Sequence, residues 1–139
     1  MSTSTTPATL HRHLLPEGWA SPRGYAHGVS AAGRTLFLGG QIGWDAQERM
    51  QDGFVPQCRQ ALENIRTLLE AGDAGPEHLV RLTWYVTDID TYAASLAPLG
   101  KAYREVLGRN YPAMALVQVV RLVEPGALVE IEATAVLPG

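Results

Sequence analysis

Apolar residues recur at spacings of three and four between residues 54 and 70, and this pattern predicts the clearest helix of the chain. Pro56 falls in the first turn, where a helix tolerates proline, and Gly72 is expected to end the helix. A single apolar stripe predicts a helix that buries one face and exposes the other. The stripe consists of Phe54, Cys58, Ala61, Leu62, Ile65, Leu68 and Leu69.

A second helical pattern ends at Leu107, and Asp88 or Asp90 is placed to cap its N-terminus. Pro98 lies inside this pattern. Because proline lacks the backbone N–H that an interior helical turn requires, we expect it to kink or divide the helix. Gly108 is expected to end the helix.

Apolar runs separated by glycine and proline predict the strands of one sheet. The order of elements favours a single domain over residues 1–139, with both helices on the same sheet face. Residues 1–9 are small and polar, and we expect them to form a flexible tail. The predicted strands are a short edge strand at 10–15, a hairpin of 25–30 and 34–39 around the turn 31–33, a strand at 79–86, and two closing strands between 111 and 136.

The second face of this sheet has no helix left to cover it. The closing strands contribute Leu116, Val117, Val119 and Val120, so we expect that face to be apolar. An apolar face that the chain does not cover itself predicts an oligomer.

Charge and cysteine content narrow the classes of function. The net charge of −3 and the lack of a basic stripe disfavour nucleic acid as a partner. Because Cys58 is the only cysteine, the chain has no internal disulfide and no cysteine-based zinc site. The place of Cys58 on the first helix predicts that it packs in the core as a small apolar residue. We predict no membrane span and no secretory signal, which together favour a cytoplasmic protein.

Glu130 and Glu132 stand two residues apart in the last predicted strand, among Val, Ile and Ala. Strand geometry places their side chains on one face, roughly 6–7 Å apart. Such carboxylates suit general acid–base chemistry or the positioning of a water molecule. A solvated edge, or ion pairs with arginine across a subunit contact, would explain them equally simply, and this explanation is favoured for Glu132.

Other candidate groups lie in the first half of the chain. Tyr25, at the junction of a loop and a strand, could offer its hydroxyl to a ligand or pack as an ordinary aromatic residue. The adjacent glycines 39 and 40 allow a ligand or another chain to approach the backbone closely. His11 and His13 alternate, but no third ligand is evident, so no metal site is predicted.

The chain resembles the RidA/YjgF family of small imine and enamine deaminases from about Pro22 to Val136. This resemblance implies a homotrimer of an α+β, chorismate-mutase-like (YjgF-like) fold with one mixed sheet and two helices on one face, and ligand pockets between subunits. The motifs that carry it are Gly28-Val29, the segment from Leu38 to Gly43, Gln60 to Ile65, Val86 to Ile89, Tyr111 to Ala113, and Val129 to Ala133.

The resemblance also implies an activity: hydrolysis of a reactive imine or enamine to a carbonyl compound and ammonia, with no metal or organic cofactor. By position, Tyr25, Gly40 and Glu130 match pocket residues of the family, and Glu130 is predicted to help hold the attacking water. A nuclease activity has also been attached to this family, but the acidic net charge argues against it as the main role.

The chain departs from the family pattern after the Pro-Ala pair, where active deaminases carry an arginine that binds the substrate carboxylate. Met114 stands there, and Leu116 replaces a cysteine found in such members. A thioether cannot form the paired charge-assisted bonds of a guanidinium, so a pocket of Met114, Leu116 and Trp44 suits a less polar ligand.

Two main hypotheses follow from this departure. The first is a deaminase with altered substrate preference, in which Arg23 or Arg121 could replace the missing carboxylate ligand. The alternative is a non-catalytic trimer that binds a small molecule in the same interfacial pocket.

Overall fold

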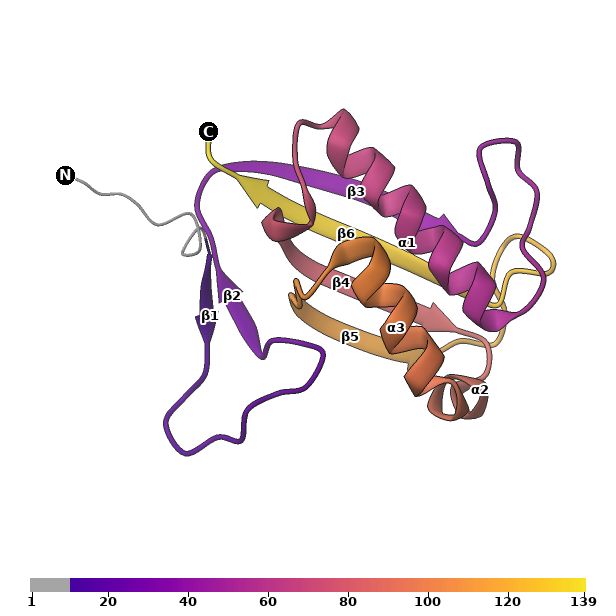
Figure 1. Ribbon diagram of the computed structural model, residues 1–139, viewed down its shortest axis with the longest axis horizontal. Helices are drawn as coiled ribbons and strands as arrows, with labels where there is room; N and C mark the ends of the chain where they lie inside the picture. The colour runs from indigo at the N-terminus through magenta and orange to yellow at the C-terminus, as the bar shows by residue number, and fades with distance from the viewer. Residues whose placement is uncertain (1–10) are drawn as a thin grey trace.

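The structure is a computed structural model that describes residues 11–139 (Figure 1). The predicted tail 1–9 and the first residue of the predicted edge strand lie outside the described residues. In chain order the elements are β1 (Arg12–Leu14), β2 (Gly28–Ser30), β3 (Arg34–Ile42), α1 (Phe54–Ala71), a 3-10 turn (Pro76–His78), β4 (Leu79–Val86), α2 (Ile89–Ala94), α3 (Leu96–Leu107), β5 (Ala113–Gln118) and β6 (Val129–Leu137).

The main sheet has the strand order β3-β6-β4-β5. Strand β6 is antiparallel to both of its neighbours, whereas β4 and β5 are parallel, so the sheet is mixed, as predicted. Figure 1 shows α1 and α3 side by side on one face of this sheet. None of the helices among residues 11–139 is long and apolar enough to cross a membrane.

The core lies between this sheet and α1, and it follows from the periodicity of both. The predicted stripe of α1 is buried except for Leu68, and alternate residues of β6, from Val129 to Leu137, are buried beneath it. Cys58 is fully buried in this layer, and burial raises the pKa of its thiol to about 12. The thiol therefore stays protonated near neutral pH and packs as a small apolar group.

The second predicted helix is divided, as the proline indicated. Helix α2 ends at Ala94 and α3 begins at Leu96, so that Pro98 falls in the first turn of α3, where no intrahelical N–H is needed. The side chain of Asp88 caps α2 by accepting hydrogen bonds from the backbone N–H groups of Asp90 and Thr91, at 2.9 and 3.2 Å. Residues 11–139 thus contain three α-helices where two were expected, and the added one is the short segment α2.

The predicted hairpin of residues 25–30 and 34–39 is wrong. Strand β2 pairs with β1 in a separate two-stranded sheet, and β3 pairs with β6. The connecting turn contains Gly33 with φ 144°, and a side chain there would overlap the backbone carbonyl of Leu137. The chain therefore passes close to the end of β6 at this glycine and continues as β3, whose first residue, Arg34, pairs with Leu137.

The expectation of an apolar second face is also wrong. Of the four residues that suggested it, only Val117 lies on that face; Leu116 faces the helices, and Val119 and Val120 follow the end of β5. Because paired residues of neighbouring strands share a face, the register gives a mixed surface. It comprises Thr35, Phe37, Ile42, Arg81, Thr83, Tyr85, Ala113, Ala115, Val117, Glu130, Glu132, Thr134 and Val136. Phe37 is its most exposed large apolar side chain, at 77%.

Gln57 is the only buried polar residue among the described core, and it ties two loops to α1. Its amide nitrogen donates to the carbonyls of Gln51 and Gly126, both at 3.0 Å. Its amide oxygen accepts from the N–H of Leu128 at 2.8 Å. The amide thus satisfies backbone groups of the loop after β3 and of the loop before β6.

We expect Gln57→Leu to lower the free energy of unfolding by about 2 kcal/mol, because three partly buried hydrogen bonds to the backbone are lost together. Urea unfolding at a fixed protein concentration measures the change. Gln47→Leu, at an exposed site, is the control and should change stability by no more than about 0.5 kcal/mol. Equal stabilities of the two variants would show that the buried amide contributes nothing.

Candidate functional site

Glu130 lies near the start of β6, an inner strand of the sheet, on the face that the helices leave open. It pairs with Tyr85 on β4, and its side chain is half-buried. Strand β3 has an irregular register between Leu38 and Gln41, where glycines 39 and 40 interrupt the pairing with β6. A side chain at Gly40 would overlap the carboxyl group of Glu130. The glycine therefore makes room for this carboxylate, and it brings together two residues that the sequence assigned to one pocket.

Glu132 shares this face but has a partner. The hydroxyl of Tyr85 donates a hydrogen bond to its carboxylate at 2.5 Å. This bond raises the pKa of Tyr85 above its ordinary value, with smaller contributions from desolvation and from the charges of both glutamates. Within residues 11–139, no such bond engages the Glu130 carboxylate. Glu132 is thus held by its own chain, and Glu130 is the carboxylate that remains for a ligand.

Met114 and Leu116 lie on the opposite face of the sheet. They pair with Leu82 and Trp84 on β4, whose side chains point toward the helices. Between β4, β5, α2 and α3 the structure has a cavity of about 200 Å³, which we call the β5 cavity. It is lined by Arg23, Gly24, Leu82, Trp84, Tyr92, Leu96, Leu99, Gly100, Tyr103, Arg104, Tyr111, Pro112, Met114 and Leu116.

One chain does not bring Glu130 and Met114 together. Glu130 is registered with Tyr85, whereas Met114 is registered with Leu82, three residues away on the same strand. Since side chains alternate between faces along a strand, an odd separation places the two groups on opposite sides. A site that uses both groups must take them from two copies of the chain.

The two candidate arginines lie in different places. Arg23 lines the β5 cavity together with Met114, in the segment that a hydrogen bond from the N–H of Ala26 to the carbonyl of Pro112 ties to the start of β5. Arg121 is exposed in the loop between β5 and β6 and lines a separate surface hollow. The structure therefore places Arg23, and not Arg121, beside Met114.

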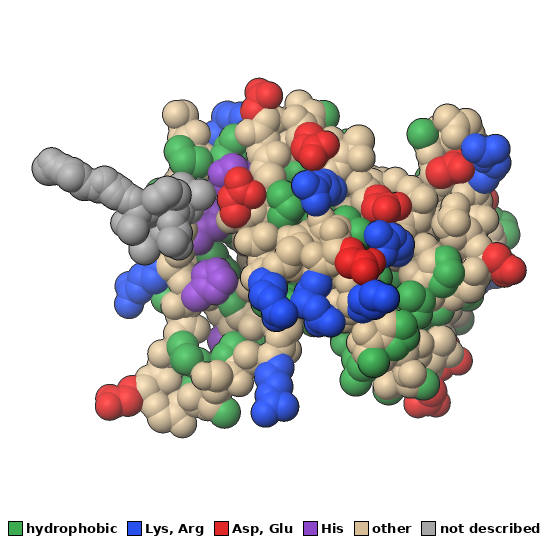
Figure 2. Space-filling model, in the orientation of Figure 1, with side chains coloured by type: hydrophobic (Ala, Val, Ile, Leu, Met, Phe, Trp, Pro, Cys, Tyr) green, Lys and Arg blue, Asp and Glu red, His purple; other side chains and the backbone are tan. Residues whose placement is uncertain are grey.

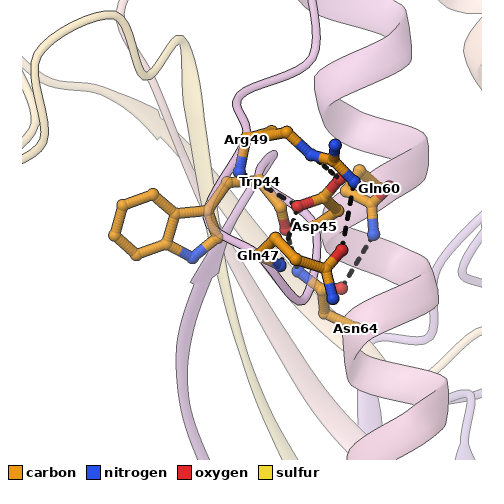
Figure 3. A network of polar contacts seen from close by, with 6 residues as sticks. All are labelled: Trp44, Asp45, Gln47, Arg49, Gln60 and Asn64. Atoms are coloured by element: carbon orange, nitrogen blue, oxygen red, sulfur yellow. Dashed lines mark hydrogen bonds and ion pairs between the residues drawn. The ribbon is translucent and has the colours of Figure 1, made fainter.

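Tyr25 and Trp44 lie outside the β5 cavity. Tyr25 lines a neighbouring hollow with Tyr111, and its ring stands edge-on to His27 at 5.3 Å. Figure 3 shows the indole of Trp44 pointing away from a polar network. In that network Asn64 donates to the carbonyl of Trp44 at 2.9 Å, which holds the loop after β3 against α1.

The same network holds Asp45. Its carboxylate accepts from the N–H groups of Gln47 and Arg49 and pairs with the Arg49 side chain at 3.1 Å. The hydrogen bond from the Arg49 N–H is the largest cause that lowers the pKa of Asp45. These bonds close the loop upon itself, so we assign Asp45 a structural role. Among residues 11–139, no three His, Cys, Asp or Glu side chains are grouped as a metal site would require.

Sequence reasoning missed several groups of the β5 cavity. The helical pattern that ends at Leu107 singles out neither the aromatic residues of α2 and α3 nor Arg104 as site residues. The feature of the sequence that could have pointed to Arg104 is Gly100, which lies four positions before it. Glycine destabilises helix interiors, so its presence inside α3 needs a reason. One helical turn separates these positions, so a glycine at the first leaves space for the side chain of the second.

Comparison with known proteins agrees with this architecture. The family model described as Endoribonuclease L-PSP matches residues 19–137. The crystal structure of a protein of unknown function from Yersinia pestis, in the conserved Rid protein family, superposes with a TM-score of 0.82 at 32% identity, covering 92% of this chain and 99% of that one. This similarity confirms the predicted YjgF-like, chorismate-mutase-like fold.

Relatives identified by sequence are similar over most of their length. A RutC family protein of Pyrococcus horikoshii is 33% identical over 124 residues, which are 88% of this chain and 94% of the relative. A 2-iminobutanoate/2-iminopropanoate deaminase of Capra hircus is 33% identical over 105 residues, 74% of this chain and 73% of the relative. The chain therefore belongs to the RidA/YjgF family.

Proposed function

We propose that this protein hydrolyses a reactive imine or enamine to a carbonyl compound and ammonia. Family membership and the similarity to a 2-iminobutanoate/2-iminopropanoate deaminase support this reaction. The observation that carries the proposal is the half-buried carboxylate of Glu130, which Gly40 accommodates on the open face of the sheet.

The proposed chemistry needs only water and a proton acceptor. Glu130 accepts a proton from water as the oxygen attacks the imine carbon, and it returns a proton to the nitrogen. The hydroxyl of the resulting carbinolamine then loses its proton, which Glu130 passes to the same nitrogen; the carbon–nitrogen bond breaks, ammonia leaves, and the carbon–oxygen double bond forms. The reaction consumes one imine and one water and moves no electrons to an acceptor, so it requires no redox cofactor.

We also propose that the active species is a homotrimer, with each site formed between two subunits. The opposite orientations of Glu130 and Met114 support this arrangement, because one subunit would supply the carboxylate and its neighbour the β5 cavity. The open face that carries Glu130 also exposes Phe37 and Val117, which subunit contact would bury.

Met114 favours a changed substrate preference in this enzyme. It replaces the arginine expected in the family with a side chain that cannot pair with a carboxylate. The same substitution favours the alternative, a trimer that binds a small molecule without turnover. A measurement of imine hydrolysis by the purified protein distinguishes the deaminase from the non-catalytic binding protein.

We expect Glu130→Gln to slow imine hydrolysis by about 10²- to 10⁴-fold, since the amide cannot accept a proton from water. Imines are generated in the assay by an amino-acid oxidase from alanine, 2-aminobutanoate, leucine and phenylalanine, and ammonia and keto acid release are followed with and without the protein. Glu132→Gln is the matched control. It keeps an oxygen that accepts from Tyr85, and its rate should stay within a few-fold of the parent.

A Glu130→Gln variant as active as the parent would contradict this mechanism. Saturable binding of a keto acid with no acceleration of any imine in the panel would instead favour the non-catalytic alternative.

The shared site predicts complementation between two inactive variants. In Met114→Trp the indole fills the β5 cavity, and in Glu130→Gln the carboxylate is lost. Randomly mixed trimers of the two variants should regain about a quarter of the parent activity, because some sites combine the intact half of each subunit. Co-refolding of an equal mixture, followed by the imine assay, measures this.

The control mixture combines Glu130→Gln with Gly40→Ala, whose added methyl group displaces the same carboxylate. Both defects lie in one half of the site, so this mixture should stay inactive. Equal recovery in both mixtures, or none in either, would show that the site is not shared in this way.

A further inference from the structure

The β5 cavity has a composition that selects its ligand. Its walls are aromatic and aliphatic, and two arginines are the only charged residues among those that line it. A cavity with two cations, no carboxylate and otherwise apolar walls complements a molecule with one large apolar group and one anionic group. The apolar lining consists of Leu82, Trp84, Tyr92, Leu96, Leu99, Tyr103, Tyr111, Pro112, Met114 and Leu116.

Arg104 reaches this cavity because of a glycine. Gly100 lines the cavity one helical turn before Arg104, and a Cβ atom at residue 100 would stand 3.2 Å from Nη1 of Arg104. That distance is tighter than ordinary van der Waals contact, so with a larger residue at position 100 the guanidinium would have to shift by a few tenths of an ångström. Glycine inside a helix is unfavourable for folding, and its presence here allows Arg104 to lie against the helix at the cavity.

The two cavity arginines also differ from those of α1. Arg59 pairs with Glu105 at 2.6 Å and Arg66 with Glu70 at 3.4 Å. Among residues 11–139, neither Arg23 nor Arg104 takes part in an ion pair. Figure 2 shows basic side chains gathered near α3, beside a notch between the lobe that carries β1 and β2 and the lobe that carries α2. These guanidiniums are therefore free to bind an anion that enters from solvent.

The cavity is large enough to hold an aromatic ring. The volume of the whole cavity is about 200 Å³. An apolar protein cavity of roughly 150 Å³ is known to hold benzene. Tyr103 and Tyr111, both in its wall, are already stacked with ring centroids 5.2 Å apart and planes 15° from parallel. A third ring can extend such a stack or meet it edge-on.

We propose that the β5 cavity binds a 2-imino acid with an aromatic side chain, and its 2-keto acid product. The ring lies among the aromatic walls, and Arg104, assisted by Arg23, binds the carboxylate. This inference rests on the proposed deaminase function for the imine, whereas the keto acid tests the cavity by itself. Arg104 is thus a binding residue that contacts the carboxylate, which the thioether of Met114 cannot bind.

The first test is direct binding of stable keto acids to the full chain by titration calorimetry. Phenylpyruvate should bind more than about 10-fold tighter than pyruvate, because only its ring removes apolar surface from water. It should also change the fluorescence of Trp84, which lies in the cavity wall. Equal affinities for the two acids would overturn the inference.

The second test uses variants at the cavity. Arg104→Met should weaken phenylpyruvate binding by about 10-fold or more and leave the affinity for uncharged phenylacetone unchanged. In the imine assay it should raise KM for the phenylalanine-derived imine more than it lowers kcat. Arg121→Met, in the distant loop, is the matched control and should bind phenylpyruvate as the parent does.

Gly100→Ala separates binding from folding. It should weaken phenylpyruvate binding several-fold while its Tm is no lower than that of the parent, because alanine favours the helix and displaces only the arginine. Unchanged phenylpyruvate binding in both Arg104→Met and Gly100→Ala would overturn the role of Arg104.

The outcomes distinguish this inference from the proposed function. Hydrolysis of small imines without phenylpyruvate binding would overturn the inference and leave the deaminase standing. Tight phenylpyruvate binding without hydrolysis of any imine would overturn the deaminase and support the ligand class assigned to the cavity.

Discussion

The alternation of side chains along β6 is the constraint on which the rest of this molecule depends. The strand pairs with β3 on one edge and β4 on the other, so a shift by one residue would break two ladders and expose the core face. With this register Ile131 and its alternate neighbours lie beneath α1, and Glu130 and Glu132 must face the open side. The core and the position of the proposed catalytic carboxylate are thus set by a single register.

Local periodicity predicted the elements that depend on local information. The stripe of α1 and the apolar run of β4 each suffice to define an element, and the structure confirms both. The partner of β2 was predicted wrongly because strand pairing depends on which distant edge is available. The partners of β2 and β3 are β1 and β6, and no pattern within residues 25–39 indicates either of them.

The candidate site was predictable in part. The sequence indicated a pocket of Met114, Leu116 and Trp44 with Arg23 as a candidate carboxylate ligand, and the structure places Met114, Leu116 and Arg23 at one cavity. Trp44 lines a different hollow, because it lies in the loop after β3, at a distance along the chain from the pairing of β5 with β4. Arg104 belongs to no motif. An arginine on a helix surface usually faces solvent, so its position along the chain gave no sign of a role in binding. The roles of Glu130 and Met114 stay predictions.

The placement of Glu130 and Met114 on opposite sides of one sheet has an evolutionary consequence. Residues on the helix side of β5 can be replaced without any contact with the carboxylate of the same chain. Selection can therefore alter which molecules are recognised while leaving the hydrolytic group and its glycine neighbour unchanged. Such a division would let related proteins change their substrate by a few substitutions, without rebuilding recognition and reactivity together.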